Sequence, residues 1–416
     1  MMLIDLFAGC GGLSLGLEKA GFKPVYVNEL NPDALETYLM NREEFPYLRD
    51  HKFHSNDIKE CINEKRFFSK LKSNLKKQHG TSEVDLICGG PPCQGFSGIG
   101  HRKSYSVEKK KLPSNYLYKD MAFFIEKLKP KIFLFENVQG LLFSKWTKEG
   151  KKGEIWEDVL NTFKSIKGYN VKFKLVKAKE YGVPQNRPRI ILVGIRKDII
   201  EHVTSEDDAV ESGFLPEGDY DYPDLEEALS DLDEKKYPLG GKTEKYLKDP
   251  KTIWQRNIRK DKKNKTLLKG AVLTEQEYSK HSKSTVERLS AIMDNNGVVP
   301  EKYENKKFSI KWLPKKWGNL GPNMTITSSP DDFIHYSKPR IPTVRECARL
   351  QTFPDYYKFS GKRTTGGIRR AGNPRVGNFH RELPKYTQIG NAVPVKMAEE
   401  FGKHFKKILR KRIDDI

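Results

Sequence analysis

The chain has 416 residues, and its 76 Lys and Arg against 55 Asp and Glu give a formal net charge of +21. This length is enough for two or three domains, and a mean hydropathy of -0.70 excludes an integral membrane protein. The excess of positive charge indicates a polyanionic partner, most simply a nucleic acid, although a generally lysine-rich composition would look the same.

The cysteines are odd in number, are scattered along the chain and show no CxxC spacing. They are Cys10, Cys61, Cys88, Cys93 and Cys347. This pattern argues against a disulfide framework and against a structural zinc site, so we expect no metal and a reducing compartment. The first residues run directly into a strand pattern without a signal peptide, and no apolar run has the length of a membrane span. We therefore expect a cytoplasmic protein with no membrane association.

The first third of the chain opens with a nucleotide-binding pattern. Residues 3–7 predict a short strand, residues 8–12 a glycine-rich turn, and residues 13–20 a helix. Such a turn lets the backbone approach a ligand at a helix N-terminus. The pattern is not the GxGxxG fingerprint of dinucleotide-binding proteins, which weakens the case for NAD.

Two acidic residues follow at positions that suit an adenosine. Glu29 ends the predicted strand 24–28, where a carboxylate can accept hydrogen bonds from both ribose hydroxyls. Asp57 and Ile58 could hold the edge and the face of an adenine. Each acid alone would more often be solvated or cap a helix. Together, and without a phosphate-binding lysine, they favour S-adenosyl-L-methionine over ATP or NAD.

A cysteine follows the next predicted strand, at residues 84–88. Two prolines fix the backbone just before Cys93, so the thiol stands at the end of a strand, where a nucleophile is expected. The alternative is a small apolar residue in a tight turn. The basic loop that follows, 94–111, is either a lid over a phosphate backbone or a solvated surface loop.

A second strand-end acid follows the predicted helix 121–128 and strand 132–135. Glu136 would be costly to bury unless it is paired or functional, and it would be the acid partner of Cys93 if their strands are neighbours. Arg187 and Arg189 flank Pro188 before the predicted strand 190–193. They suit a rigid pocket edge better than surface ion pairs.

Six motifs in these positions resemble those of the DNA (cytosine-5)-methyltransferases of bacterial restriction–modification systems. They occupy residues 7–12, 90–97, 136–138, 185–189, 343–354 and 388–394. Their order is that of the family, and they leave mainly 197–342 unmatched.

The resemblance implies an α/β fold, namely a Rossmann-like S-adenosylmethionine-dependent methyltransferase fold with a smaller, mixed target-recognition domain. Residues 1–197 would form the first part of the catalytic and cofactor-binding domain. Residues 198–340 would form the target-recognition domain. Residues 341–416 would supply a hinge helix (345–351), a turn at 388–394 and a last helix (395–409) that returns to the catalytic domain.

The resemblance also implies roles for the site residues. Cys93 would attack C6 of a cytosine flipped out of the duplex, and Glu136 would bind N3 and the exocyclic amine. Arg189 would bind O2, and Arg187 would orient Glu136. Gln94 and Ser97 would contact DNA from the loop. The predicted cofactor-binding residues are Asp5, Phe7, Ala8, Gly9, Gly11, Glu29, Asp57, Ile58, Pro92, Leu117, Asn391 and Val393.

The partners implied are double-stranded DNA and, functionally, a restriction endonuclease, and we expect a monomer. A tRNA cytosine-5 methyltransferase is an alternative, but the long basic insert argues against it. A catalytically inactive DNA-binding protein is another, and the presence of Cys93, Glu136 and Arg189 argues against that.

Overall fold

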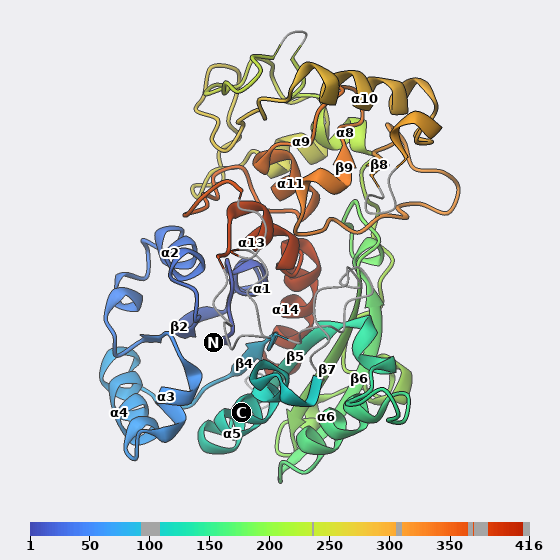
Figure 1. Cartoon of the computed structure of the whole chain (residues 1–416). Coiled ribbons are helices and arrows are strands. Elements are labelled where there is room, and N and C mark those ends of the chain that lie inside the picture. Colours follow the sequence, from blue (N-terminus) through green and yellow to red (C-terminus); the bar gives the residue numbers. More distant parts are fainter. Residues whose placement is uncertain (93–108, 235–236, 305–309, 365–368, 370–381, 411–416) are drawn as a thin grey trace.

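The computed structural model describes residues 1–92, 109–234, 237–304, 310–364, 369 and 382–410, and its lower part is built on one sheet (Figure 1). The strands of this sheet lie in the order β3-β2-β1-β4-β5-β7-β6. Among the described strands of this sheet, β7 alone is reversed, and the others run parallel to one another. The strands are β1 (Met2–Leu6), β2 (Lys23–Asn28), β3 (His54–Ser55), β4 (Leu86–Gly89), β5 (Ile132–Val138), β6 (Tyr169–Lys177) and β7 (Pro188–Arg196). The predicted α/β, Rossmann-like fold class is confirmed.

Side chains alternate between two cores on the two faces of this sheet, as the period of a strand requires. Phe133 and Phe135 of β5 face one core, whereas Ile132 and Leu134 face the other. The first core is covered by α2 (Pro32–Met40), α3 (Ile58–Asn63), α4 (Phe67–His79), α5 (Leu117–Leu128) and α6 (Glu154–Lys164). The second is covered by α1 (Gly12–Lys19) and α14 (Val395–Arg410). The result is a three-layer α/β/α arrangement.

The last helix, α14, packs directly against the first helix, α1, although they are almost 400 residues apart in sequence (Figure 1). Gly16 permits this approach, because a Cβ at that position would lie 2.4 Å from the carbonyl oxygen of Val395. The C-terminal helix therefore lies against the sheet that contains the N-terminal strands. The prediction of a simple turn at 388–394 was wrong in part, since α13 (Lys385–Asn391) includes its first residues.

A second group of elements forms an upper lobe above the sheet (Figure 1). We use this name for α8 (Leu225–Leu229), α9 (Ile253–Ile258), α10 (Lys283–Asp294), β8 (Lys311–Trp312), β9 (Phe333–Ile334) and α11 (Val344–Leu350). Between β7 and this lobe, a short helix, α7 (Ser205–Asp208), precedes Phe214 and Leu215, which still pack into the core that contains α14. The helix predicted at 345–351 is confirmed as α11.

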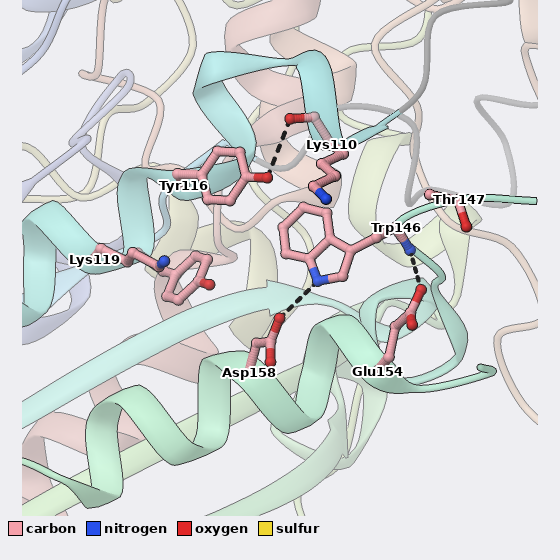
Figure 2. A pocket seen from close by; sticks show the side chains of 8 residues that line it. Lys110, Tyr116, Lys119, Trp146, Thr147, Glu154 and Asp158 are labelled. Atoms are coloured by element: carbon pink, nitrogen blue, oxygen red, sulfur yellow. Dashed lines mark hydrogen bonds between the residues drawn. The ribbon is translucent and has the colours of Figure 1, made fainter. Parts of the chain in front are cut away.

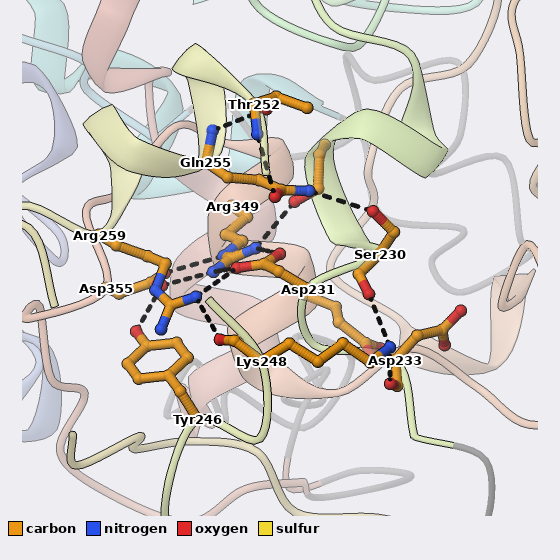
Figure 3. A network of polar contacts seen from close by, with 12 residues as sticks. Ser230, Asp231, Asp233, Tyr246, Lys248, Thr252, Gln255, Arg259, Arg349 and Asp355 are labelled. Carbon is orange, nitrogen blue, oxygen red and sulfur yellow. Dashed lines mark hydrogen bonds and ion pairs between the residues drawn. The ribbon is translucent and has the colours of Figure 1, made fainter. Parts of the chain in front are cut away.

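Buried ion pairs join α11 to the rest of the upper lobe (Figure 3). The Arg349 guanidinium lies 2.5 Å from Asp231 and 2.6 Å from Asp355. Arg259 lies 3.3 Å from the same Asp231 and stacks on the ring of Tyr246, whose hydroxyl donates to Asp355. This network holds α11 against α8 and α9. Among the helices described, none combines the length and the apolar character that crossing a membrane requires.

Candidate active site

The glycine-rich turn after β1 has a backbone that ordinary residues rarely adopt. Phe7, Gly9 and Gly11 have φ angles of 57°, 55° and 79°. A Cβ at Gly9 would meet no atom within 4 Å, so open space adjoins the turn at this point. Ala8 and Phe7 are half-buried, and the Ala8 amide donates to the Asn28 carbonyl of β2. The turn is therefore fixed to the neighbouring strand and open on one side.

Glu29 lies at the edge of this turn, as its position after β2 predicts. One carboxylate oxygen accepts a hydrogen bond from the Gly9 amide and the other accepts one from the Asn31 amide, both at 2.8 Å. Burial raises the pKa of this carboxyl. A carboxylate can accept about four hydrogen bonds, so Glu29 retains capacity for a ligand hydroxyl.

Three other predicted cofactor residues are engaged within the protein. The Asp5 carboxylate lies under the turn, where it accepts hydrogen bonds from Ser14 and from the Cys88 thiol, and burial raises its pKa to about 6. Asp57 caps α3 by accepting from the Lys59 amide at 2.8 Å. The Ile58 side chain packs into the sheet core.

The remaining predicted cofactor residues differ in their exposure to solvent. Leu117 is half-buried at the start of α5, and Pro92 is exposed after β4. Asn391 is exposed at the end of α13, whereas Val393 is buried against α1. The carbonyl oxygen of Val393 would lie 2.4 Å from a Cβ at Gly12, so the C-terminal segment touches the glycine turn.

Cys93, Gln94 and Ser97 lie outside the described residues. The strand that leads to them, β4, pairs in parallel with β5, which contains Glu136. The two strands are therefore neighbours. Asn137 donates to the carbonyl of Pro91 at 3.1 Å. This anchoring residue was missed by the sequence analysis, although it stands inside the motif at 136–138.

Glu136 and Arg189 form the most prominent polar pair at this edge. Arg189 Nε lies 2.7 Å from Glu136 Oε1, and both side chains are about nine-tenths buried. Glu136 stands opposite Ile191, so Arg189 is its diagonal neighbour on the same face of the sheet. Gly90 makes room for the acid, because a Cβ there would lie 2.8 Å from Glu136 Oε2. The strand predicted at 132–135 proves longer, since pairing with β7 extends β5 to Val138.

Arg187 has a different environment from the one predicted. Its guanidinium donates to the carbonyls of Ile326 and Gly390, at 3.1 and 2.7 Å, and is fully buried. The residue in contact with Glu136 is therefore Arg189. Arg187 precedes β7 and connects the sheet to the upper lobe and α13.

A separate cavity of about 360 Å³ lies beside α5 and the segment that follows β5 (Figure 2). Tyr116 and Trp146 stack along it with ring centroids 5.0 Å apart. Trp146 donates through its indole to Asp158 and through its backbone amide to Glu154. These two acids belong to the first turns of α6, which forms one side of the cavity.

The cysteines and acids within the described part of the chain suggest no metal centre. Cys10, Cys61, Cys88 and Cys347 are buried and free, and no group of three or more potential ligands occurs among the described residues. Burial raises the pKa of the Cys10 thiol to about 12 and that of Cys88 well above its usual value. Cys88 is thus a structural cysteine, as its place within the strand predicts.

Comparisons with known proteins agree with this architecture. A family model described as C-5 cytosine-specific DNA methylase matches residues 1–407. The type II methyltransferase M.DdeI of Desulfomicrobium norvegicum is 32% identical, over 96% of this chain and 87% of that protein. The type II methyltransferase M.FnuDI of Fusobacterium nucleatum is 30% identical, over 98% and 95%. A crystal structure of a prophage-encoded DNA modification methyltransferase from E. coli has the same fold, with a TM-score of 0.66 at 24% identity over 99% of both chains.

A parallel sheet with one reversed strand, a glycine turn facing an acid, and a strand-end acid paired with arginine define the class of α/β methyltransferases. Within that class, the chain belongs to the C-5 cytosine-specific DNA methylases. It is a DNA (cytosine-5)-methyltransferase.

Proposed function

We propose that this enzyme transfers the methyl group of S-adenosyl-L-methionine to C5 of a cytosine within a specific double-stranded DNA sequence. The observation that carries the proposal is the buried pair of Glu136 and Arg189. Glu136 stands on β5, next to β4, whose continuation carries Cys93. In this proposal the acid, the arginine and the thiol act on the same cytosine.

The cofactor site fits a nucleoside rather than a phosphate. Open space lies over Gly9, and the buried Glu29 carboxylate faces the same turn. Glu29 would bind the ribose hydroxyls, and Asp57 would face the adenine with Ile58 behind it. When bound, S-adenosyl-L-methionine supplies an electrophilic methyl group.

Cys93 would supply the nucleophile, because C5 of an intact cytosine ring is too weak a nucleophile to take a methyl group. The Cys93 thiolate adds to C6, and the ring electrons that this addition displaces make C5 the attacking atom. S-adenosyl-L-methionine, held by Glu29 and the glycine turn, would supply the methyl group that C5 takes up. Loss of the C5 proton to a base re-forms the C5–C6 double bond and expels the Cys93 thiolate.

Glu136 would hydrogen-bond N3 and the exocyclic amine of the cytosine, and Arg189 would bind O2. Their ion pair holds the acid in one rotamer before the base arrives, so little ordering is left to the reaction. Groups that assist proton movement in this way typically contribute about 10²–10⁴-fold in rate.

The cytosine must leave the duplex to reach this pocket, at a cost of a few kcal/mol. The net charge of +21 supplies phosphate contacts that offset the cost. Gln94 and Ser97 would contribute to them, and residues 198–340 would read the sequence. We further propose that the enzyme acts as a cytoplasmic monomer and protects DNA from a cognate restriction endonuclease, because its relatives are type II methyltransferases.

The experiment is bisulfite sequencing of DNA from a host that expresses the protein. One recurring sequence with a modified cytosine is the expected result for the wild type, and Cys93→Ser should abolish the modification. Glu136→Gln should lower the rate by about 10²-fold or more while DNA binding persists. Cys347→Ala, which removes a buried thiol of α11, is the matched control and should remain active. Unmodified cytosines throughout with the wild type, or modification by Cys93→Ser, would contradict the proposal.

A further inference from the structure

The carbonyl side of the glycine turn is held by a buried arginine that no motif of the chain contains. Arg42 lies just beyond the end of α2 and is 2% exposed. Its guanidinium forms an ion pair with Glu18 of α1 at 2.6 Å and stacks on the ring of Tyr38 at 3.6 Å. It also donates to the Gly11 carbonyl at 3.2 Å and to the Tyr38 carbonyl at 2.9 Å.

A tyrosine from the other end of the chain completes this contact. Tyr357 is fully buried, and its hydroxyl donates to the Cys10 carbonyl at 2.6 Å. The same hydroxyl accepts a hydrogen bond from Arg42 at 3.2 Å. Two consecutive carbonyls of the turn, those of Cys10 and Gly11, are therefore held by two side chains that contact each other.

These contacts act on the conformation of the turn. Because a peptide unit is planar, holding the Cys10 and Gly11 carbonyls fixes the planes of the two peptide units that lead into α1. Gly11 fits tightly here, since a Cβ would lie 2.8 Å from Tyr38 and 2.9 Å from the Arg42 guanidinium. At Gly9, in the same turn, a Cβ would meet no atom within 4 Å.

Burying Arg42 and Glu18 costs desolvation free energy, which a role in stability alone does not explain. A buried ion pair often contributes no more than apolar side chains of the same volume would. A long apolar residue at position 42 could fill the space against Tyr38, but it could not hold a carbonyl. The cost of burying Arg42 is therefore better explained by the geometry that it imposes on the turn.

We propose that Arg42 and Tyr357 are positioning residues for cofactor binding, which hold the glycine turn in the shape that accepts S-adenosyl-L-methionine. The inference rests on the proposed function of this turn. It assigns to each residue an effect on the affinity for the cofactor and not on the chemical step, because neither touches the reacting atoms.

The sharpest test is Tyr357→Phe, which removes only the hydroxyl and keeps the ring in its core. The matched control is Tyr169→Phe, because the Tyr169 hydroxyl is also buried and donates to a backbone carbonyl, that of Pro130, at the other edge of the sheet. Kd for S-adenosylhomocysteine by calorimetry, KM for S-adenosyl-L-methionine, kcat at saturating cofactor and Tm are measured for each.

For Tyr357→Phe we expect Kd and KM to rise about tenfold, from the loss of one to two hydrogen bonds, with kcat changed less than about twofold. Tyr169→Phe should leave Kd and KM unchanged at a similar loss of Tm. Arg42→Lys keeps the charge near Glu18 but not the planar fork, and should show the same rise in KM.

Equal KM values for the wild type, Tyr357→Phe and Arg42→Lys would overturn the inference and leave a structural role only. A fall in kcat without a change in KM would also overturn it. Failure of the proposed function gives a different result, because the wild type itself would then neither bind S-adenosylhomocysteine nor methylate DNA.

Discussion

Glu136 illustrates how individual residues of this enzyme combine burial with charge. Its carboxylate is removed from solvent between Gly90 and β7, and the Arg189 guanidinium at 2.7 Å compensates the charge. Asp5 has no such cation in contact among the described residues, and burial raises its pKa to about 6. Glu136 is thus paired with an arginine, whereas Asp5 accepts hydrogen bonds from a hydroxyl and a thiol.

A buried histidine gives the stability of the enzyme a defined pH dependence. His335 lies 3.5 Å from Glu346, whose carboxylate is occupied by the Arg340 guanidinium at 2.7 Å. Its Nδ1 accepts from the Ser337 amide, and burial lowers its pKa from 6.5 to about 4. The folded protein therefore keeps His335 neutral at a pH where the unfolded chain takes up a proton.

We predict that this residue destabilises the protein in mild acid. The stability that comes from keeping His335 neutral is fully present above pH 6.5. It is lost as the pH falls toward about 4. At pH 5 the loss in unfolding free energy should be about 2 kcal/mol relative to pH 7. In His335→Asn, which keeps an acceptor for Ser337, urea unfolding at the two pH values should show a loss smaller by this amount. The exposed His51→Asn is the control, and equal losses in all three proteins would show that His335 does not titrate in this range.

At the scale of elements, the position of α11 depends on one buried arginine. Arg349 pairs with Asp231, which follows α8, and with Asp355, which follows α11 itself (Figure 3). Arg259 of the α9 region and the Tyr246 hydroxyl complete the partners of these acids. The arrangement of α8, α9 and α11 within the upper lobe is thus determined by directional contacts as well as by apolar packing.

The predicted effect of Arg349→Met is a large loss of stability. Two carboxylates would remain buried without their main partner, and removing one member of a buried pair typically costs about 3–5 kcal/mol. Denaturant unfolding measures this loss. Arg49→Met is the matched control, because Arg49 pairs with Glu36 at 3.1 Å on the exposed surface. That pair should contribute less than about 1 kcal/mol. Similar losses in the two variants would refute the assigned role.

At the scale of the whole molecule, charge is the dominant property. The formal net charge is +21, and a DNA duplex, which is a polyanion, is attracted by it. The proposed cofactor site involves few charges, namely the carboxylates of Asp5, Glu29 and Asp57.

We therefore predict that added salt weakens the binding of DNA but not the binding of the cofactor. DNA affinity should fall by about 10³-fold or more between 50 and 200 mM salt if six or more phosphates are contacted. Affinity for S-adenosylhomocysteine should change little over the same range, which makes it an internal control in the same protein. Fluorescence anisotropy with a labelled duplex measures the first and calorimetry the second. A DNA affinity as insensitive to salt as the cofactor affinity would refute electrostatic DNA binding.

Much of the sheet could be predicted from the sequence because its strands are marked locally. Apolar runs before residues 8, 29, 93 and 136 fit β1, β2, β4 and β5, and glycine and proline mark their ends. The motif residues on these strand ends follow from the same pattern. The limits of β5 could not be predicted, because its last residues are strand only through pairing with β7.

The sequence by itself determined the fold class, the family and the position of Glu136 at the end of a strand. The tertiary structure decided that this strand lies beside the one that leads to Cys93. Tertiary structure alone decided which arginine contacts Glu136, and it selected Arg189 because β7 runs antiparallel to β5 and places that residue diagonally opposite. It also decided that Arg42 and Tyr357 hold the glycine turn. Such contacts join residues hundreds of positions apart, and no local propensity or periodicity encodes which distant side chain will fill a given space.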